Sequence, residues 1–219
     1  MRDFLNKHKW TLLITSVIIL LPIVVGLLLW DKLPEQVPFH WGINGEVDGW
    51  ATKTQAVFLM PLMMLGIQWL CSILTQLDPK GKNHNNKMME IVLWIIPVLN
   101  LFLHVMVWLQ AFGRDINMAA IMPLFMGALF VVLGNYLPKC RQSYTVGIKL
   151  PWTLNDEENW NKTHRLAGKL WVAGGLLCMP CALLSGVWSF IVMMSILVVM
   201  CAFPTVYSYR LYKKNKQEE

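Results

Sequence analysis

Residues 170–209 read LWVAGGLLCMPCALLSGVWSFIVMMSILVVMCAFPTVYSY, forty residues without a single Asp, Glu, Lys or Arg. A transmembrane helix needs about 20 apolar residues, because an α-helix rises about 1.5 Å per residue and the hydrocarbon core is about 30 Å thick. One helix of forty residues would overshoot the bilayer by about 30 Å. We therefore expect two spans, residues 168–185 and 189–209, joined by a tight turn around Ser185 to Ser189.

Four earlier runs lack the same charged residues, and each is long enough for one span: residues 10–30, 55–77, 91–112 and 116–137. The whole chain is 56% hydrophobic and 15% charged, against about 25% charged in soluble domains. The first run is longer than the roughly 7–15 apolar residues of a signal peptide core. The sequence predicts an all-α polytopic membrane protein, residues 1–219 forming a single membrane domain with six transmembrane helices.

Basic residues predict the orientation of these spans. The N-terminus, the second and fourth connections and the C-terminal tail hold sixteen of the nineteen Lys and Arg residues, and the other connections hold three. Cytoplasmic segments carry the excess of Lys and Arg, so we expect both termini in the cytoplasm of a multi-pass cell membrane protein. The net charge of +6 then implies contact with anionic lipids of the bilayer. Direct nucleic-acid binding is not needed to explain it.

The interior of the predicted spans offers one ionisable candidate, His104, with Asn100 one helical turn before it. One interpretation is that the pair joins helices through hydrogen bonds; the other is that His104 is a pH-sensitive or ligand-contacting group. The interior of the predicted spans contains no carboxylate or lysine with which His104 could exchange protons, which argues against a proton-coupled transporter. Cys178 and Cys181 match C-x-x-C, but inside an apolar helix they are more typical of packing than of redox chemistry.

Signatures of membrane enzymes are missing from the sequence. It contains neither H-E-x-x-H nor G-x-S-x-G, so we predict no catalytic residues, no enzyme activity and no cofactor. A metal at His40, with Asp48 or Glu46 beside it, stays open, because two or three such residues in one loop are a weak signal. We assign no metal site.

The predicted outer loop, residues 31–54, combines prolines, glycines and acids, so it should be extended and then sharply turned. Its centre, HWGINGEVDGW at residues 40–50, interleaves aromatic, turn-forming and acidic residues. One interpretation is an ordered turn with Trp41 and Trp50 at the membrane interface. The other is a recognition surface facing the outside. Both can hold for one segment.

The predicted cytoplasmic loop, residues 138–167, is extended at Pro151 and then has the spacing of a helix start at Asn155 to Glu158. On that helix Trp160 and His164 lie one turn apart and share a face. The segment could be an amphipathic helix on the membrane surface, or it could be a docking site for a cytoplasmic partner.

At these two loops the sequence resembles the SdpI family of bacterial membrane proteins. In the outer loop the resemblance rests on a P-x-H-W-x3-G-x2-D-x4-K pattern: Leu33, Pro34, Pro38, His40, Trp41, Gly45, Asp48 and Lys53. In the second region it rests on a longer, irregularly spaced set: Gly134, Asn135, Pro138, Lys139, Gly147, Ile148, Pro151, Trp152, Thr153, Leu154, Trp160, Thr163, His164, Arg165 and Gly168. The chain departs from the family pattern at Ser143 and at Lys149 and Leu150, where Lys keeps the charge of Arg but loses its bidentate fork.

The resemblance implies an immunity protein that protects the cell from a secreted membrane-active peptide toxin by binding it. It also implies signal transduction, in which the toxin-bound protein recruits a transcriptional repressor to the membrane. Outer-loop binding would involve His40, Trp41, Gly45, Asp48 and Lys53. Cytoplasmic partner binding would involve the loop residues Asn135, Pro151, Trp152, Thr153, Trp160, Thr163, His164 and Arg165. The alternative is a small-molecule or ion transporter, or a membrane enzyme, with an unrecognised site near His104.

Overall fold

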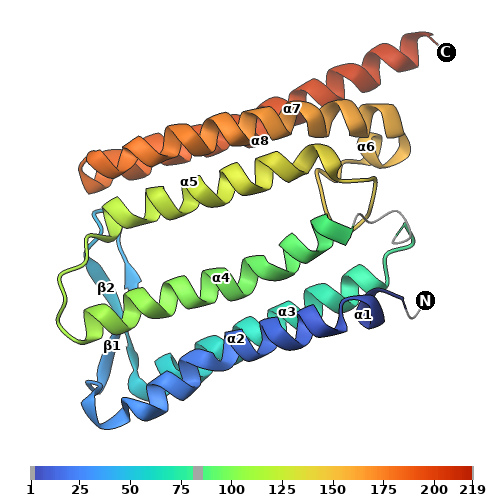
Figure 1. The fold of residues 1–219 in the computed structure, drawn as a ribbon. Coiled ribbons are helices and arrows are strands. Elements are labelled where there is room, and N and C mark those ends of the chain that lie inside the picture. Colours follow the sequence, from blue (N-terminus) through green and yellow to red (C-terminus); the bar gives the residue numbers. More distant parts are fainter. Residues whose placement is uncertain (1–2, 81–85, 219) are drawn as a thin grey trace. The chain divides into compact units, whose positions relative to one another are not determined.

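A computed structural model describes residues 3–80 and 86–218. Within these residues six helices are long and apolar enough to cross a membrane, which confirms the predicted fold class (Figure 1). They cover Lys9–Leu28, Gln55–Gln76, Asn86–Ala111, Met118–Lys139, Glu157–Leu183 and Gly186–Gln217. Arg2 and Lys82, two of the basic residues used to predict orientation, lie outside the described residues, and the orientation itself stays a prediction.

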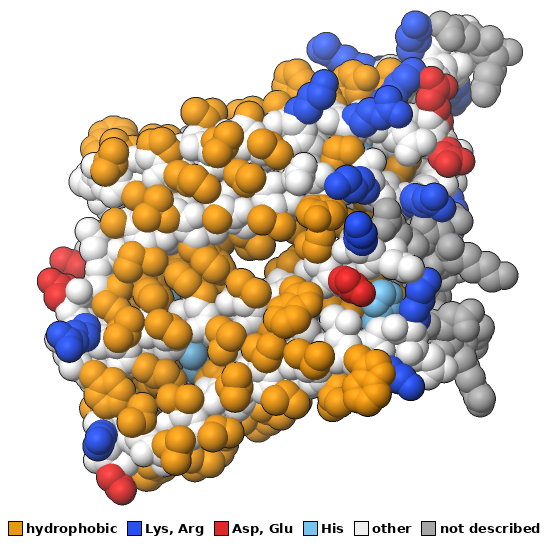
Figure 2. Space-filling model, viewed as in Figure 1, with side chains coloured by type: hydrophobic (Ala, Val, Ile, Leu, Met, Phe, Trp, Pro, Cys, Tyr) orange, Lys and Arg blue, Asp and Glu red, His pale blue; other side chains and the backbone are white. Residues whose placement is uncertain are grey.

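The chain forms two compact units. Unit 1 comprises the described residues up to Leu77 and Met89–Asn117; unit 2 comprises the described part of Asp78–Met88 and residues from Met118 onward. On the face shown in Figure 2, hydrophobic side chains cover the middle of the helices in each unit, and Lys and Arg gather near helix ends. That distribution fits helices whose flanks face lipid and whose ends face water.

Unit 1 contains three of the long helices and a β-hairpin. Its elements are α1 (Asp3–Lys7), α2 (Lys9–Leu28), η1 (Trp30–Lys32), β1 (Gln36–Trp41), β2 (Val47–Thr52), the π-helix η2 (Gln55–Leu59), α3 (Met60–Gln76) and most of α4 (Asn86–Ala111). Buried polar side chains join the helices. Gln68 of α3 donates from Nε2 to Thr15 Oγ1 at 3.1 Å and to the Leu93 carbonyl at 3.0 Å. Such bonds hold helices together where lipid offers no hydrophobic driving force.

Unit 2 contains the other three long helices and the folded connection between two of them. Its elements are α5 (Met118–Tyr136), η4 (Leu137–Lys139), α6 (Pro151–Asn155), α7 (Glu157–Cys178), η5 (Met179–Leu183) and α8 (Gly186–Glu218). Helices α5 and α7 approach closely at paired glycines. A Cβ at Gly127 would lie 2.6 Å from the Gly175 carbonyl oxygen, and one at Gly134 would lie 2.6 Å from the Val172 nitrogen. Small residues are what allow such close backbone contact.

Local boundaries differ from the prediction in several places. The predicted outer loop contains two strands that the sequence analysis did not anticipate. The fifth long helix begins at Glu157, and its N-cap is Asp156. The expected N-cap was Asn155, one residue earlier, but Asn155 is the last residue of α6. Helix α8 continues beyond residue 209 to Glu218. The break before α8 lies at Leu184 and Ser185, since η5 ends at Leu183 and α8 begins at Gly186, so most of the turn expected from Ser185 to Ser189 is helical.

Candidate functional site

The hairpin of unit 1 is an antiparallel pair in which Val37 opposes Ala51 and Trp41 opposes Val47. Its tip is closed by hydrogen bonds from Gly42 N–H to the Glu46 carbonyl and from Gly45 N–H to the Gly42 carbonyl, both 2.9 Å. Gly45 has a φ of 84°, a conformation that glycine adopts without the steric penalty of a Cβ. The five residues between the strands, Gly42 to Glu46, are built around the turn from Gly42 to Gly45, a common form of longer hairpin loop.

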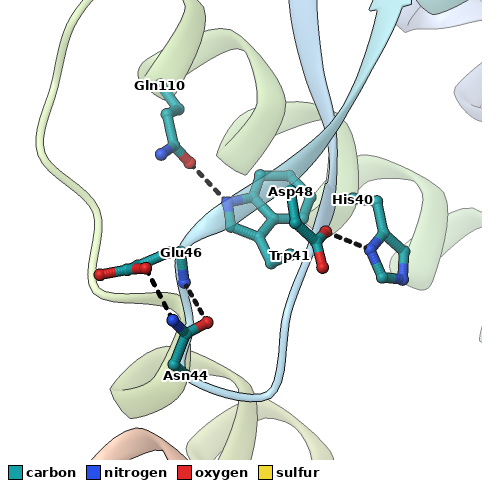
Figure 3. A network of polar contacts seen from close by, with 6 residues as sticks. All are labelled: His40, Trp41, Asn44, Glu46, Asp48 and Gln110. Atoms are coloured by element: carbon teal, nitrogen blue, oxygen red, sulfur yellow. Dashed lines mark hydrogen bonds and ion pairs between the residues drawn. The ribbon is translucent and has the colours of Figure 1, made fainter.

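One side of the hairpin holds a paired histidine and aspartate (Figure 3). The His40 Nδ1–H donates to Asp48 Oδ1 at 2.5 Å, and both side chains are more than half exposed. Glycines make room for the pair, since a Cβ at Gly49 would lie 2.8 Å from His40 Cβ and one at Gly42 would lie 2.9 Å from Asp48 Oδ2. The remaining ring nitrogen, Nε2, is left to interact with solvent or a ligand.

Two residues of the family pattern, Trp41 and Lys53, hold the base of the hairpin in place and are not free in solvent. Trp41 donates from Nε1 to Gln110 Oε1 of α4 at 2.7 Å (Figure 3). Lys53 pairs with Glu35 at 2.9 Å and lies 4.8 Å above the Trp30 ring, with its side chain only 13% exposed. The hairpin therefore stands on a fixed base and is not a free loop.

Exposed aromatic side chains remain on the hairpin after these anchors are made. Phe39 is 41% exposed and Trp50 is 59% exposed. From the sequence, Trp50 was expected either at the membrane interface or on a recognition surface, and Phe39 was not selected. Together with His40 and Asp48 they give the hairpin a mixed aromatic and polar surface, the kind that is enriched where proteins bind partners.

In unit 2 the connection between α5 and α7 folds around a buried carboxylate, Asp78. Its Oδ2 accepts hydrogen bonds from Tyr144 N–H at 2.9 Å and from both N–H and Oγ1 of Thr145 at 3.1 and 2.9 Å. Its Oδ1 accepts from Lys80 N–H at 2.8 Å. Lys80 then donates from Nζ to Gln142 Oε1 at 2.6 Å. These charge-assisted bonds fix the path of residues 142–145.

Further along the same connection, Trp160 and His164 of α7 hold the chain in place. Their rings stack with centroids 4.1 Å apart. His164 Nδ1–H donates to the Trp160 carbonyl at 2.8 Å, and Nε2 accepts from Ile148 N–H at 2.9 Å. Because one ring nitrogen donates and the other accepts, this arrangement requires the neutral imidazole. Gly147, with a φ of 117°, packs directly against both rings.

Helix α6 is fastened to α8 by the residues around Trp152. The Trp152 Nε1–H donates to Ser208 Oγ at 2.9 Å, and the indole lies 5.2 Å from the Tyr209 ring centroid. Asn159 donates from Nδ2 to the Ser208 carbonyl at 2.9 Å and accepts from Thr163 Oγ1 at 3.0 Å. Thr153 accepts from Leu150 N–H at 3.0 Å. The α5–α7 connection is thus an ordered structure held by side-chain hydrogen bonds.

These contacts separate the predicted cytoplasmic-loop residues into two groups. Thr153, Trp160, Thr163 and His164 are buried, so they shape the connection and cannot touch a partner directly. Asn135, Pro151 and Arg165 are exposed, and Trp152 is half-buried. Sequence reasoning missed the inner supports of this region, which are Asp78, Lys80, Gln142, Asn159 and Ser208. Only the turn-forming Asp78-Pro79 could have suggested that a structured loop begins there.

The described residues offer neither a cluster of metal ligands nor a reactive buried thiol. Among them no group of three or more His, Cys, Asp or Glu side chains could hold a metal ion. Cys178 and Cys181 are free and buried. Cys140 is also buried, and burial raises the pKa of its thiol to about 12. A thiol that is protonated at neutral pH is a poor nucleophile and a poor metal ligand.

The fold and these two regions define a multi-pass helical membrane protein with an elaborated structure at each of two connections. Residues 139–208 match the SdpI/YfhL protein family, and residues 17–65, which include the hairpin, match a domain of unknown function, DUF1648. The chain is 26% identical over 208 residues to the immunity protein SdpI of Bacillus subtilis (strain 168), covering 92% of this chain and 96% of that protein. The resemblance to the SdpI family is confirmed by these matches. No solved structure matches the chain.

Proposed function

We propose that this protein is an SdpI-like immunity protein of the plasma membrane, which protects its cell by binding a secreted membrane-active peptide toxin without catalysis. The relationship to an immunity protein along nearly the whole chain supports the biological role. The basic residues of the connections and tail support an orientation with both termini in the cytoplasm and the hairpin outside.

The observation that carries the binding proposal is the hairpin, which is rigidly based and exposes aromatic side chains. Trp41 and Lys53 fix its base, whereas Phe39 and Trp50 stay exposed. Among the described residues the sheet has two strands, and an extended peptide can add to the edge of a sheet by main-chain hydrogen bonds. The aromatic residues would then supply contact area, and His40 with Asp48 would supply polar orientation.

The test compares Trp50→Ala with Trp10→Ala in cells that lack the native gene. Trp10 is the matched control, because it is 67% exposed but stands at the start of α2, about 30 Å along the helix from the hairpin end. With equal protein levels, Trp50→Ala and His40→Ala should lose protection against the toxin, and Trp10→Ala should keep it. Deletion cells that are no more sensitive than the parent would refute the immunity role. Equal protection by Trp50→Ala and Trp10→Ala would refute the hairpin as the binding surface.

A second role, recruitment of a cytoplasmic repressor, is favoured by the exposed rim of the α5–α7 connection. Pro151 and Arg165 are exposed there over a buried, hydrogen-bonded base. Such a surface can hold a partner without refolding. Membranes carrying the protein should retain a cytoplasmic partner after toxin exposure, and Arg165→Ala should release it, whereas Arg114→Ala in unit 1 should not. A pull-down that finds no partner in either condition would contradict this role.

A further inference from the structure

Helix α4 of unit 1 carries a row of buried polar side chains at a spacing of four residues: Asn100, His104 and Trp108. They are 0%, 2% and 7% exposed, and each has one polar atom without a hydrogen-bond partner among the described residues. Residues four apart lie on one face of a helix. We call this row the α4 seam. Ser16 of α2 adds a further unpartnered buried atom, its Oγ.

The contacts that do exist fix what each free atom can do. Asn100 donates from Nδ2 to the Ile19 carbonyl at 3.0 Å, which leaves its Oδ1 as the free acceptor. His104 Nδ1 lies 2.8 Å from the Asn100 carbonyl and must donate to it, so Nε2 is a second free acceptor. Trp108 Nε1 is a free donor, since an indole N–H can only donate. The seam therefore offers two acceptors and one donor.

Leaving these atoms unpaired inside a membrane protein would be costly, because a buried polar group without a partner has lost its hydrogen bonds to water and gained none in return. The Ala56 backbone carbonyl lies beside the His104 ring, but a carbonyl can only accept and therefore cannot pair with Nε2 as an acceptor. Trp108 packs in an apolar cluster with Leu33, Val37, Ala56 and Val57 at the base of the hairpin.

We propose that the α4 seam is a buried hydration site, occupied by water molecules that donate to Asn100 Oδ1 and His104 Nε2 and accept from Trp108 Nε1. Water matches this set, because it can both donate and accept and buried waters typically bind otherwise unpaired polar groups. Asn100 and Trp108 are eight residues apart, about 12 Å along the helix axis, so one molecule cannot serve all three side chains. The site needs at least two waters in sequence. This inference is independent of the immunity role.

Unit 2 supplies a matched control inside the same chain. His164 and Trp160 are also a histidine and a tryptophan four residues apart on one helix, and they are 1% and 0% exposed. All their polar side-chain atoms have protein partners: His164 bonds to Trp160 and Ile148, and Trp160 Nε1 donates to the Cys140 carbonyl at 2.8 Å. Burial is thus similar in both pairs. They differ in their unpartnered atoms and in ring geometry, since the ring centroids are 5.9 Å apart for His104 and Trp108 and 4.1 Å apart for Trp160 and His164.

X-ray hydroxyl-radical footprinting of the full chain in lipid nanodiscs tests the proposal, because radicals formed from bound water oxidise the side chains beside it. We expect His104 and Trp108 to be oxidised several-fold faster than His164 and Trp160. Equal or slower oxidation of His104 and Trp108 would show that the seam is dry and would overturn the proposal.

A second measurement does not depend on a radical reaction. Ultraviolet resonance Raman difference spectra, wild type minus Trp108→Phe, isolate the indole of Trp108, and wild type minus Trp160→Phe isolates the control. The proposal expects a hydrogen-bonded N–H in both difference spectra. A free N–H for Trp108 beside a bonded one for Trp160 would overturn it. Trp108→Phe removes only the N–H and part of the ring, so the variant keeps an aromatic side chain in the cluster.

Discussion

The substitution Gly147→Ala is the sharpest test of the folded α5–α7 connection. A Cβ at this position would lie 2.6 Å from His164 Nε2 and 2.7 Å from the Trp160 ring, and the residue has a φ of 117°. Overpacking costs about 1–3 kcal/mol, and a left-handed conformation costs a residue with a Cβ roughly 1–2 kcal/mol. We therefore expect Gly147→Ala to destabilise unit 2 by about 2–5 kcal/mol.

Two other glycines separate the two causes. Gly113 also has a positive φ, 76°, but a Cβ there would meet nothing within 4 Å, so Gly113→Ala should cost only the backbone term of about 1–2 kcal/mol. Gly66 lies inside α3 with nothing within 4 Å, so Gly66→Ala should be neutral or stabilising by about 0.5–1 kcal/mol.

Thermal unfolding in detergent, followed by alkylation of buried thiols, measures all three variants. Cys140 reports on the connection directly, because its Sγ lies 3.4 Å from the Val146 carbonyl oxygen next to Gly147. Gly147→Ala should expose Cys140 at a temperature lower by about 4 °C or more, given roughly 2–4 °C per kcal/mol in a protein of this size. Gly147→Ala that unfolds at the same temperature as Gly66→Ala would refute the packing of Gly147 against His164 and Trp160.

The remaining predictions concern single groups of the same connection. Asp78→Asn should lower the free energy of unfolding by about 2–4 kcal/mol, because a charged acceptor of several hydrogen bonds is lost. Chemical unfolding measures this change, and an unchanged midpoint would contradict the role of the buried carboxylate. Thr153→Val should cost about 1–3 kcal/mol, since Leu150 N–H loses its acceptor, and the same measurement against an exposed Thr54→Val control checks it. Alkylation of Cys140 at pH 8 should be about a thousandfold slower than for a thiol of ordinary pKa, since burial raises its pKa from 9.0 to about 12. The pKa of the Cys140 thiol is higher in the folded than in the unfolded state, so its contribution to stability is complete below pH 9 and is lost as the pH rises toward 12. Fast alkylation of Cys140 at pH 8 would refute its burial.

The long helices could be predicted from the sequence because the signal for a span is a simple one. A run without charges that is long enough to cross the bilayer leaves few alternatives, and residues 170–209 had to break into two helices. Small and polar residues interrupt the run from Ser185 to Ser189, and the helix α8 begins within that segment, at Gly186. Chain direction relative to the membrane rests on charge alone and stays a prediction.

The hairpin was missed although its sequence contained a signal. Asn44-Gly45 between Val37-to-Trp41 and Val47-to-Thr52 is a turn between two short runs with strand-forming residues. Pro38, Gly42 and Gly49 suggested an irregular loop, because proline and glycine are usually poor strand residues. The structure shows the reason for Gly49, which gives the His40 side chain the space it occupies.

In the α5–α7 connection the shared face of Trp160 and His164 follows from helical spacing, but their burial does not. Spacing along one helix says nothing about what covers that face, and here it is covered by Gly147 and Ile148 from the same connection. Asp78 could not be found for a related reason. Tyr144 and Thr145, which donate to its Oδ2, lie more than sixty residues later in the chain, and no local pattern records a contact at that distance.

The central claim is that the exposed face of the hairpin captures a peptide toxin. A photo-crosslinking amino acid at position 50, with position 10 as the control, tests it directly in living cells challenged with the peptide to which the deletion strain is sensitive. We predict a covalent adduct between the peptide and the protein carrying the crosslinker at position 50, and none at position 10. Adducts at neither position, or equally at both, would contradict the assignment of the hairpin as the toxin-binding surface.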